Sequence, residues 1–345
     1  MKVGVVGCGY WGPNLVRNLI ETNRCESIYC YDSNSRSTQK VQGRYPSLLI
    51  ADSLEQLVSD CDAVMVATPV SSHYPVAMYA LQRGKGVFVE KPLAASSQEC
   101  EELIDLAEQK NATLMVGHTF VYSPPVRKIR EYCDRGQLGH VYFLSSYRVN
   151  LGIHRRDVDV MWDLAPHDLS MFLYWMQETP VRVSAAGRAC VGRMLDIASL
   201  RMEFASGAIA HLEVSWLAPS KLRRTVLVGS KSMVLYDDMD VDKVKLYDRG
   251  VMQDAPNSFG EYQLTYRSGD IVSPNLDATE PLLTQTHHFL DCVESGSRPA
   301  TDGRLGLEIV RVLEAASQSV KGDGSLVDVE GHVPLPRTEY WQAAV

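Results

Sequence analysis

The sequence predicts an α/β fold: a doubly wound parallel sheet at the N-terminus, then an α+β domain with a large, mainly antiparallel open sheet. Over the first 118 residues, apolar runs alternate with helical patterns, as in a parallel sheet with helical crossovers. From Phe120 the pattern changes to short runs of alternating polarity separated by Gly, Ser and Asp, which is typical of antiparallel strands. A length of 345 residues also favours two domains. We place them at 1–120 and 121–345.

The elements of the first half are expected in alternation. The apolar runs predict strands at Lys2–Val6, Ser27–Tyr31, Leu48–Ile50, Ala63–Pro69, Val87–Val89 and Thr113–His118. Helices are expected to begin where a proline or a capping side chain suits a first turn: at Pro13, at Asp52 or Ser53, at Ser71 or Ser72, and at Ser96 or Ser97.

The second half predicts helices and short strands. Helices are expected at Pro124–Gly136, Pro281–Ser295 and Asp302–Val320. Strands are expected at Val141–Asn150, in a hairpin within Ala198–Leu217, and at Thr225–Val228, Met233–Tyr236 and Val244–Tyr247. The polar stretch Asp248–Thr279 is predicted to be a loop. One broad sheet face is left uncovered, which favours a homodimer or homotetramer through this sheet.

Composition limits the class of function. The hydrophobic fraction is 45% and the charged fraction 22%, as in ordinary globular proteins. A net charge of -8 argues against nucleic-acid binding, and no apolar run approaches the roughly 20 residues of a membrane span. The N-terminus enters a strand at once, so we expect no signal peptide. Eight cysteines without Cys-x-x-Cys pairs or zinc-like spacings indicate reduced thiols in a cytoplasmic protein, with no metal site.

A glycine-rich turn, Gly7-Cys8-Gly9-Tyr10-Trp11-Gly12, joins the first strand to the first helix. Gly-x-Gly-x-x-Gly in this context is typical of dinucleotide binding, although a glycine-rich turn without a ligand has the same sequence. Gly7 allows the tight turn, Gly9 lets a pyrophosphate approach, and Gly12 lets the helix pack closely. The helix N-terminus then offers free N–H groups to the phosphates. We predict a Rossmann domain that binds a dinucleotide here, with Tyr10 and Trp11 among its contacts.

The second strand ends at Asp32, where an acid accepts hydrogen bonds from the hydroxyls of the adenosine ribose. A carboxylate there repels a 2′-phosphate, which favours NAD. Ser33 and Arg36 follow closely, and an arginine can hold a phosphate or cover the adenine. We therefore expect NAD, with NADP possible.

Further polar residues follow strands whose carboxyl ends share one edge of the sheet. Glu90, Lys91 and Pro92 come directly after the apolar run Val87–Val89, and ligands of open α/β sheets bind at this edge. Pro92 restrains Lys91 to extended geometry, so Lys91 can offer a charge or a proton to the cleft. A solvated pair at a strand end is the alternative.

Four further residues near the ends of other strands are expected at the same edge. Thr68 and Pro69, with His73 in the next helix, can contact the nicotinamide side of a dinucleotide, or His73 can be solvated or capping. His118 follows the sixth strand and is expected to be a structural histidine, hydrogen-bonded at the domain junction.

The run Met161-Trp162-Asp163-Leu164-Ala165-Pro166-His167-Asp168 holds a second candidate group. Asp163 and His167 are four apart, so one helical turn places them on the same side. Pro166 is expected in the first turn, which puts both at the N-terminal end of the helix. A carboxylate beside an imidazole orients it for acid–base work. Alternatively, Asp163 caps the helix and His167 is a satisfied structural residue.

Together these residues resemble the glucose–fructose oxidoreductase / inositol dehydrogenase / rhizopine-catabolism (Gfo/Idh/MocA) family of NAD(P)-dependent oxidoreductases. The resemblance covers essentially the whole chain and rests on five elements: the glycine motif, Ala67-Thr68-Pro69 with His73, Glu90-Lys91-Pro92, Asp163 with His167, and Asp302-Gly303-Arg304. It implies a Rossmann domain, a C-terminal sheet that mediates dimers or tetramers, and hydride transfer between nicotinamide C4 and a carbinol carbon.

The resemblance also implies roles. His167 is the acid/base, Lys91 hydrogen-bonds the same substrate oxygen, and Asp163 positions the substrate or His167; the physics agrees, since a cation favours the charge that develops on that oxygen. The runs Gly117-His118-Thr119-Phe120 and Trp162–Asp168 look most like members that act on C3 of sugar nucleotides. Tyr122 and Arg155 are candidate substrate contacts.

Several alternatives stay open. Arg148, Arg155 and Arg156 can hold a uronate carboxylate or a diphosphate, or form a solvated basic loop. The substrate can be a cyclitol instead, or a 3-ketosugar that is reduced in a deoxysugar pathway. A dinucleotide sensor without catalysis is a further alternative, but it predicts loss of Lys91 or His167, and both are present.

Overall fold

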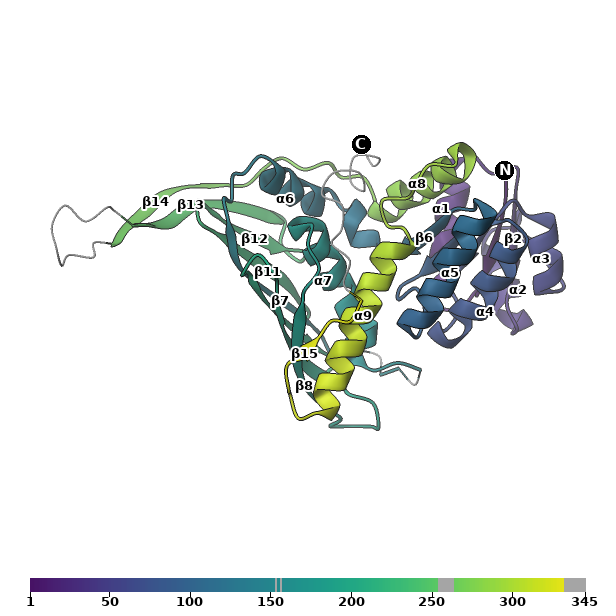
Figure 1. Cartoon of the computed structure of the whole chain (residues 1–345). Coiled ribbons are helices and arrows are strands. Elements are labelled where there is room, and N and C mark those ends of the chain that lie inside the picture. The colour runs from purple at the N-terminus through teal and green to yellow at the C-terminus, as the bar shows by residue number, and fades with distance from the viewer. Residues whose placement is uncertain (153, 156, 254–263, 332–345) are drawn as a thin grey trace. The chain divides into compact units, whose positions relative to one another are not determined.

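The computed structural model describes residues 1–152, 154–155, 157–253 and 264–331, and the chain folds into two compact units (Figure 1). The first unit holds Met1–Tyr122 and Thr279–Glu314, and the second holds Ser123–Ala278 and the described residues from Ala315 onward. The predicted boundary after residue 120 lies close to the break at Tyr122. The assignment of all of 121–345 to one domain differs from the structure, because Thr279–Glu314 packs with the first unit.

The first unit is built on a six-stranded parallel sheet in the order β3-β2-β1-β4-β5-β6. Its strands are β1 Lys2–Val6, β2 Ser27–Tyr31, β3 Leu49–Ile50, β4 Ala63–Val66, β5 Gly86–Glu90 and β6 Leu114–Gly117. Its crossover helices are α1 Gly12–Thr22, α2 Ser35–Arg44, α3 Leu54–Asp60, α4 His73–Gln82 and α5 Ser97–Lys110. Every residue of β4, β5 and β6 is buried, as in strands covered on both faces. The doubly wound sheet is confirmed.

Two of the predicted helix caps are confirmed and one is wrong. The Ser53 and Ser96 side chains accept hydrogen bonds from Gln56 N and Glu99 N, which satisfies free N–H groups of the first turn. Before α4, a 3₁₀ turn at Val70–Ser72 already winds the chain. Ser72 therefore has helical rather than extended geometry and makes no capping bond.

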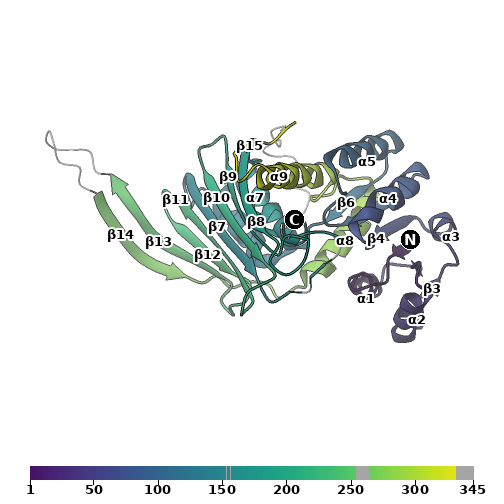
Figure 2. The ribbon, with the colours of Figure 1, turned by 90° about the horizontal axis from the view of Figure 1, so that it is seen from below.

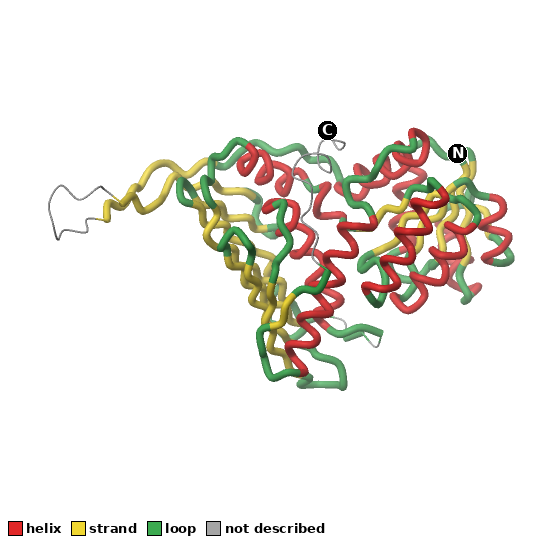
Figure 3. The backbone as a smooth tube through the Cα atoms, in the orientation of Figure 1, coloured by secondary structure: helices red, strands yellow, loops and turns green. Residues whose placement is uncertain are grey.

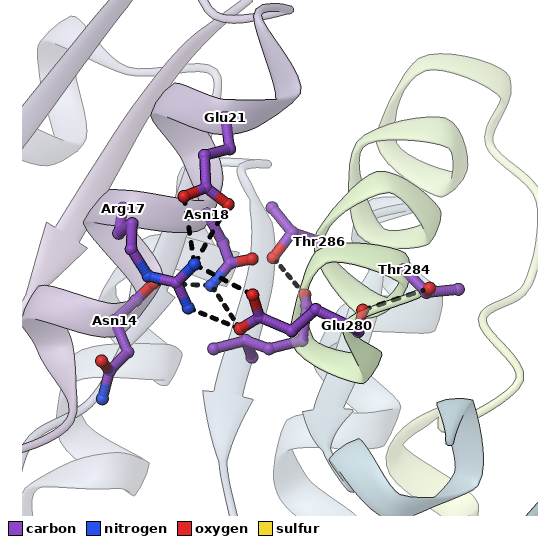
Figure 4. Close-up of polar contacts among 8 residues, drawn as sticks. Asn14, Arg17, Asn18, Glu21, Glu280, Thr284 and Thr286 are labelled. Carbon is purple, nitrogen blue, oxygen red and sulfur yellow. Dashed lines mark hydrogen bonds and ion pairs between the residues drawn. The ribbon is translucent and has the colours of Figure 1, made fainter. Parts of the chain in front are cut away.

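Helix α8 (Pro281–Ser295) packs on α1 within the first unit (Figure 4). Glu280, just before α8, accepts hydrogen bonds from the Arg17 guanidinium and, at 3.5 Å, from Asn18 Nδ2. Phe289 is fully buried, with its ring centroid 5.7 Å from that of Phe88 on β5. These contacts explain why the segment after Thr279 belongs to the first unit.

The second unit is built on a nine-stranded sheet in the order β14-β13-β12-β11-β7-β10-β9-β8-β15. All neighbours are antiparallel except β7 and β10, which are parallel. The strands are β7 Val141–Val149, β8 Arg182–Arg188, β9 Ile197–Glu203, β10 Ile209–Ser215, β11 Leu222–Gly229, β12 Met233–Asp237, β13 Val244–Gln253, β14 Leu264–Val272 and β15 Val327–Asp328. The helices are α6 Pro124–Asp134, α7 Val160–Met176 and the end of α9, which runs from Gly303 to Lys321.

Helices cover one face of this sheet and leave the other open (Figures 2 and 3). Along β7, Leu144, Ser146 and Arg148 are buried on the side of α7, whereas Tyr147 on the other side is 42% exposed. The mainly antiparallel open sheet is thus confirmed. No helix within the described ranges is long and apolar enough to cross a membrane.

The loop predicted at Asp248–Thr279 is wrong for Asp248–Gln253 and Leu264–Val272, because β13 and β14 pair there as a long antiparallel hairpin. Exposed side chains such as Tyr266 (77%) and Asp248 leave no polar–apolar alternation to reveal these strands. Residues 254–263 of the predicted loop lie outside the described residues.

Candidate active site

The glycine turn has the geometry that a dinucleotide requires. Gly7 has φ +96°, and a Cβ there would lie 2.6 Å from Ala67 O. A Cβ at Gly12 would lie 1.9 Å from Gly7 O, so both positions need glycine. Gly9, in contrast, faces open space, where a phosphate group can approach the backbone. Tyr10 is 87% exposed beside this opening. The loop therefore fits a dinucleotide.

Asp32 at the end of β2 is fixed by the same loop. Its carboxylate accepts hydrogen bonds from Cys8 N at 2.7 Å and from Asn34 N at 2.8 Å. Ser33 and Arg36 are exposed next to it. Two backbone donors leave lone pairs on the carboxylate for ribose hydroxyls, as the motif predicts.

Glu90 at the end of β5 is bound to the glycine turn. Trp11 Nε1 donates a hydrogen bond of 2.6 Å to Glu90 Oε1. The carboxyl lies over Gly117, where a Cβ would come within 2.9 Å of Oε2. Burial raises the pKa of Glu90 to about 7, although Lys91 and the Trp11 hydrogen bond favour the charged form. Glu90 therefore links the cofactor loop to the strand that carries Lys91.

The raised pKa of Glu90 makes stability depend on pH. Between pH 4.5 and about 7 the folded protein keeps a proton that the unfolded chain loses, so stability falls as pH rises through this window. Relative to Glu90→Gln, the free energy of unfolding of the wild type should fall by about 3 kcal/mol across it. Urea titrations of both proteins at several pH values measure this. A constant difference between them would contradict the assignment.

His73 joins two strand ends. It is 1% exposed, and its Nδ1 and Nε2 lie 2.8 Å from Pro92 O and 2.9 Å from Thr68 O. It is thus neither the solvated nor the capping residue of the alternative reading. The bridge holds Thr68-Pro69 after β4 beside Lys91-Pro92 after β5. Direct contacts of Thr68, Pro69 and His73 with a cofactor stay predictions.

Lys91 follows β5 at the carboxyl edge of the first sheet, where the sequence places it.

His118 follows β6 and is 1% exposed. Neither of its ring nitrogens has a hydrogen-bond partner in the described parts of the chain. The expectation of a hydrogen-bonded structural histidine is therefore wrong for the residues described. Burial and the Lys91 charge lower the pKa of His118 to about 3, so the ring is neutral near pH 7. Tyr122 is 1% exposed, and its hydroxyl lies 3.1 Å from Thr301 Oγ1.

Helix α7 of the second unit carries Asp163 and His167. Its cap is Asp159, which accepts hydrogen bonds from Met161 N and Trp162 N, so Asp163 is not the cap. The expectation that Pro166 lies in the first turn is wrong, because α7 begins at Val160 and Pro166 lies inside it. Asp163 is in the first turn, and His167 follows one turn later.

The Asp163 carboxylate joins three segments of the second unit. Arg155 Nη1 donates to Oδ1 at 3.2 Å, and Trp216 Nε1 donates to Oδ2 at 3.2 Å. Arg155 also makes two hydrogen bonds to Asp157. Trp216 follows β10, far from α7 in sequence, and no sequence pattern pointed to it.

A buried ion pair fixes α7 to the sheet. Asp168 pairs with Arg148 on β7, and their side chains are 2% and 3% exposed. Ser146 Oγ also donates to Asp168 at 2.7 Å. The expectation of a solvated loop is wrong for Arg148, because it lies on the covered face of β7. Arg156 lies outside the described residues. Asp168, the polar residue directly after His167, was the one sign in the sequence that could have suggested this ion pair.

Comparisons with known proteins agree with both units. Residues 1–118 match the oxidoreductase family with an NAD-binding Rossmann fold, and residues 126–235 match the Gfo/Idh/MocA C-terminal domain. UDP-N-acetylglucosamine 3-dehydrogenase of Acidithiobacillus ferrooxidans is 27% identical over 251 residues, or 72% of this chain and 78% of that protein. The NADP(+)-dependent scyllo-inositol 2-dehydrogenase IolW of Bacillus subtilis is 23% identical over 93% of this chain and 94% of its own.

A solved structure shares the fold. GenD2 from gentamicin A biosynthesis, in complex with NAD, has a TM-score of 0.80 at 23% identity and covers 95% of this chain and 96% of its own. The residues matched by the two family models include the glycine turn and Lys91 in the first unit, and Asp163 with His167 in the second. The chain therefore belongs to the Gfo/Idh/MocA family of NAD(P)-dependent oxidoreductases.

Proposed function

We propose that the protein transfers a hydride between nicotinamide C4 and a ring carbon, C3 in our assignment, of a sugar or sugar nucleotide. The observation that carries this proposal is the position of Lys91, directly after β5 and linked through Glu90 to a turn that fits a dinucleotide. The UDP-N-acetylglucosamine 3-dehydrogenase relative supports the choice of substrate.

The roles of the residues follow from their chemistry. When bound, the nicotinamide ring donates or accepts the hydride. His167 takes the hydroxyl proton or returns it, and Lys91 donates a hydrogen bond to the same oxygen and stabilises its negative charge. Asp163 positions the substrate or His167. The proposed cofactor contacts are the residues predicted from the sequence: Gly7, Gly9, Tyr10, Trp11, Gly12, Asp32, Ser33, Arg36, Thr68, Pro69, His73, Glu90 and Lys91.

A surplus of positive charge favours an anionic substrate group over a neutral cyclitol. Arg223 on β11 is the register partner of Arg148 on β7. Asp238 accepts hydrogen bonds from Arg223 at 3.2 Å and from Lys243 at 3.3 Å, so two cations share one carboxylate. Lys221 lies just before β11, and the Arg223 charge lowers its pKa. We propose that Lys221 and Arg223 hold the diphosphate or carboxylate of the substrate.

Replacing Lys221 with Gln tests this assignment. We expect KM for a UDP-sugar to rise about tenfold, because one charge-assisted contact is lost. KM for a neutral cyclitol should not change. Lys245→Gln is the matched control, because Lys245 is paired with Asp240 and should leave both constants unchanged. Equal effects of Lys221→Gln on charged and neutral substrates would contradict the proposal.

The open sheet face supports a homodimer or homotetramer. Phe143, Ile209, Val228 and Met233 are register neighbours across four strands on the face opposite α7, and each is half-buried. An apolar strip of this kind is commonly covered by a copy of the chain. Sedimentation equilibrium should give a dimer or tetramer; a monomer at micromolar concentration would contradict this.

A substrate screen tests the proposed function as a whole. NAD+ and NADP+ reduction should be followed with UDP-sugars, free sugars and cyclitols. Turnover of a UDP-sugar supports the proposal. Turnover of cyclitols alone would move the substrate to the inositol class, for which the IolW relative is the precedent. Activity only in the reduction of a 3-ketosugar would place the enzyme in a deoxysugar pathway. Binding of the dinucleotide without any turnover would favour a dinucleotide sensor without catalysis.

A further inference from the structure

We infer that Trp216 is a positioning residue whose indole N–H fixes the Asp163 carboxylate in the orientation the reaction needs. This inference rests on the proposed function, because it requires that Asp163 acts on the substrate or on His167. All of the contacts that support it lie within the second unit.

The Asp163 carboxylate is oriented from two sides. Trp216 Nε1 donates to Oδ2 and Arg155 Nη1 donates to Oδ1, each at 3.2 Å. Arg155 is 36% exposed and is shared with Asp157, whereas Trp216 is 2% exposed. Of these two donors, the indole is the more enclosed and the less free to turn, so it constrains the orientation of the carboxylate more strongly than the guanidinium does.

The same indole supports the segment that leads into α7. Asn150 N and Gly152 N donate to Ser215 O and Trp216 O at 3.1 and 2.9 Å, so the segment lies along the end of β10. A Cβ at Gly152 would lie 2.8 Å from Trp216 Cδ1. The His154 ring lies 5.4 Å from the indole, measured between centroids. A shift of Trp216 would therefore move both Asp163 and the segment that carries Arg155.

Trp175 provides a matched control within the same unit. It is also 2% exposed, and its indole N–H donates to Val126 O at 2.9 Å. The partner is a backbone carbonyl, so Trp175 is a purely structural counterpart of Trp216. Trp→Phe at either position removes the donor and keeps an apolar ring, and a general loss of packing should affect both variants alike.

The test is a kinetic double-mutant cycle with Asp163→Asn. Trp216→Phe should lower kcat/KM about tenfold, the effect of losing one hydrogen bond to a charged group, and should leave the Kd of the dinucleotide unchanged. In the Asp163→Asn background Trp216→Phe should have no further effect, because it acts through Asp163. Trp175→Phe should change kcat/KM little in either background. Independent, multiplicative effects of Trp216→Phe and Asp163→Asn would overturn the inference.

A second variant covers the case in which Trp216→Phe fails to fold. Gly152→Ala presses a methyl group on the indole and should lower kcat/KM in the same direction, again without effect in Asp163→Asn. Gly192→Ala is its control, because a Cβ there meets nothing within 4 Å. If Asp163→Asn retains full activity while His167→Ala abolishes it, the positioning role is wrong and the proposed function stands. If His167→Ala is fully active, the acid–base role assigned to His167 in the proposed function is wrong; if the wild type turns over none of the substrates in the screen, the proposed function itself fails.

Discussion

His167→Ala should lower kcat by about a thousandfold, because a general acid–base group contributes on the order of 10²–10⁴ to the rate. The imidazole lies on α7, one turn after Asp163, and the proposed reaction needs a group that accepts the hydroxyl proton as the hydride leaves. Binding of the dinucleotide should be unchanged, because all of the residues proposed to contact it lie in the first unit, whereas His167 lies in the second. Stopped assays of product and direct titration of the cofactor measure the two effects separately.

Lys91→Met completes this prediction. Methionine is unbranched like lysine, one atom shorter, and carries no charge, so the oxygen loses a hydrogen-bond donor and kcat should fall about 100-fold or more. Lys85→Met in the same unit is the control and should be fully active. If both His167→Ala and Lys91→Met keep wild-type turnover on the true substrate, the mechanism is wrong.

Asp168→Asn should have the largest effect on stability. Asp168 and Arg148 form a buried ion pair, and the change leaves the guanidinium charge without its carboxylate in a buried site. Breaking such a pair from one side costs about 3–5 kcal/mol of unfolding free energy. Urea denaturation measures it, with Asp240→Asn as the exposed control that should leave stability unchanged within error.

A double replacement separates the charge from the packing. In Arg148→Met/Asp168→Leu no buried charge remains, so much of the lost stability should return. If Asp168→Asn alone costs less than about 1 kcal/mol, the pair is not the anchor of α7 that its burial indicates.

The sequence predicted the elements that local patterns encode. Ser27–Tyr31 and Pro281–Ser295 have the predicted bounds, because alternation or a proline at the first turn marks their ends. The glycine turn was predicted with its function, since its spacing follows from the approach of a phosphate. The candidate acid–base pair was found from its spacing of four residues, although Pro166 was placed in the wrong turn.

Contacts between distant residues could not be predicted in this way. The return of α8 to the first unit depends on Glu280 meeting Arg17, 263 residues away. Likewise, Trp216 meets Asp163 across 53 residues, and Arg148 meets Asp168 across a strand and a helix. Such pairs are fixed by tertiary packing, and no periodicity within either segment reveals them.

The transfer of deuterium from the substrate tests the central claim most directly. UDP-N-acetylglucosamine labelled with deuterium at C3 should be incubated with the enzyme and the oxidised dinucleotide, and the reduced dinucleotide should be analysed by mass spectrometry. The proposed reaction predicts that the label appears at nicotinamide C4 and that the sugar becomes a 3-keto product. Reduced dinucleotide without deuterium, formed while the label stays on the sugar, would contradict hydride transfer from C3.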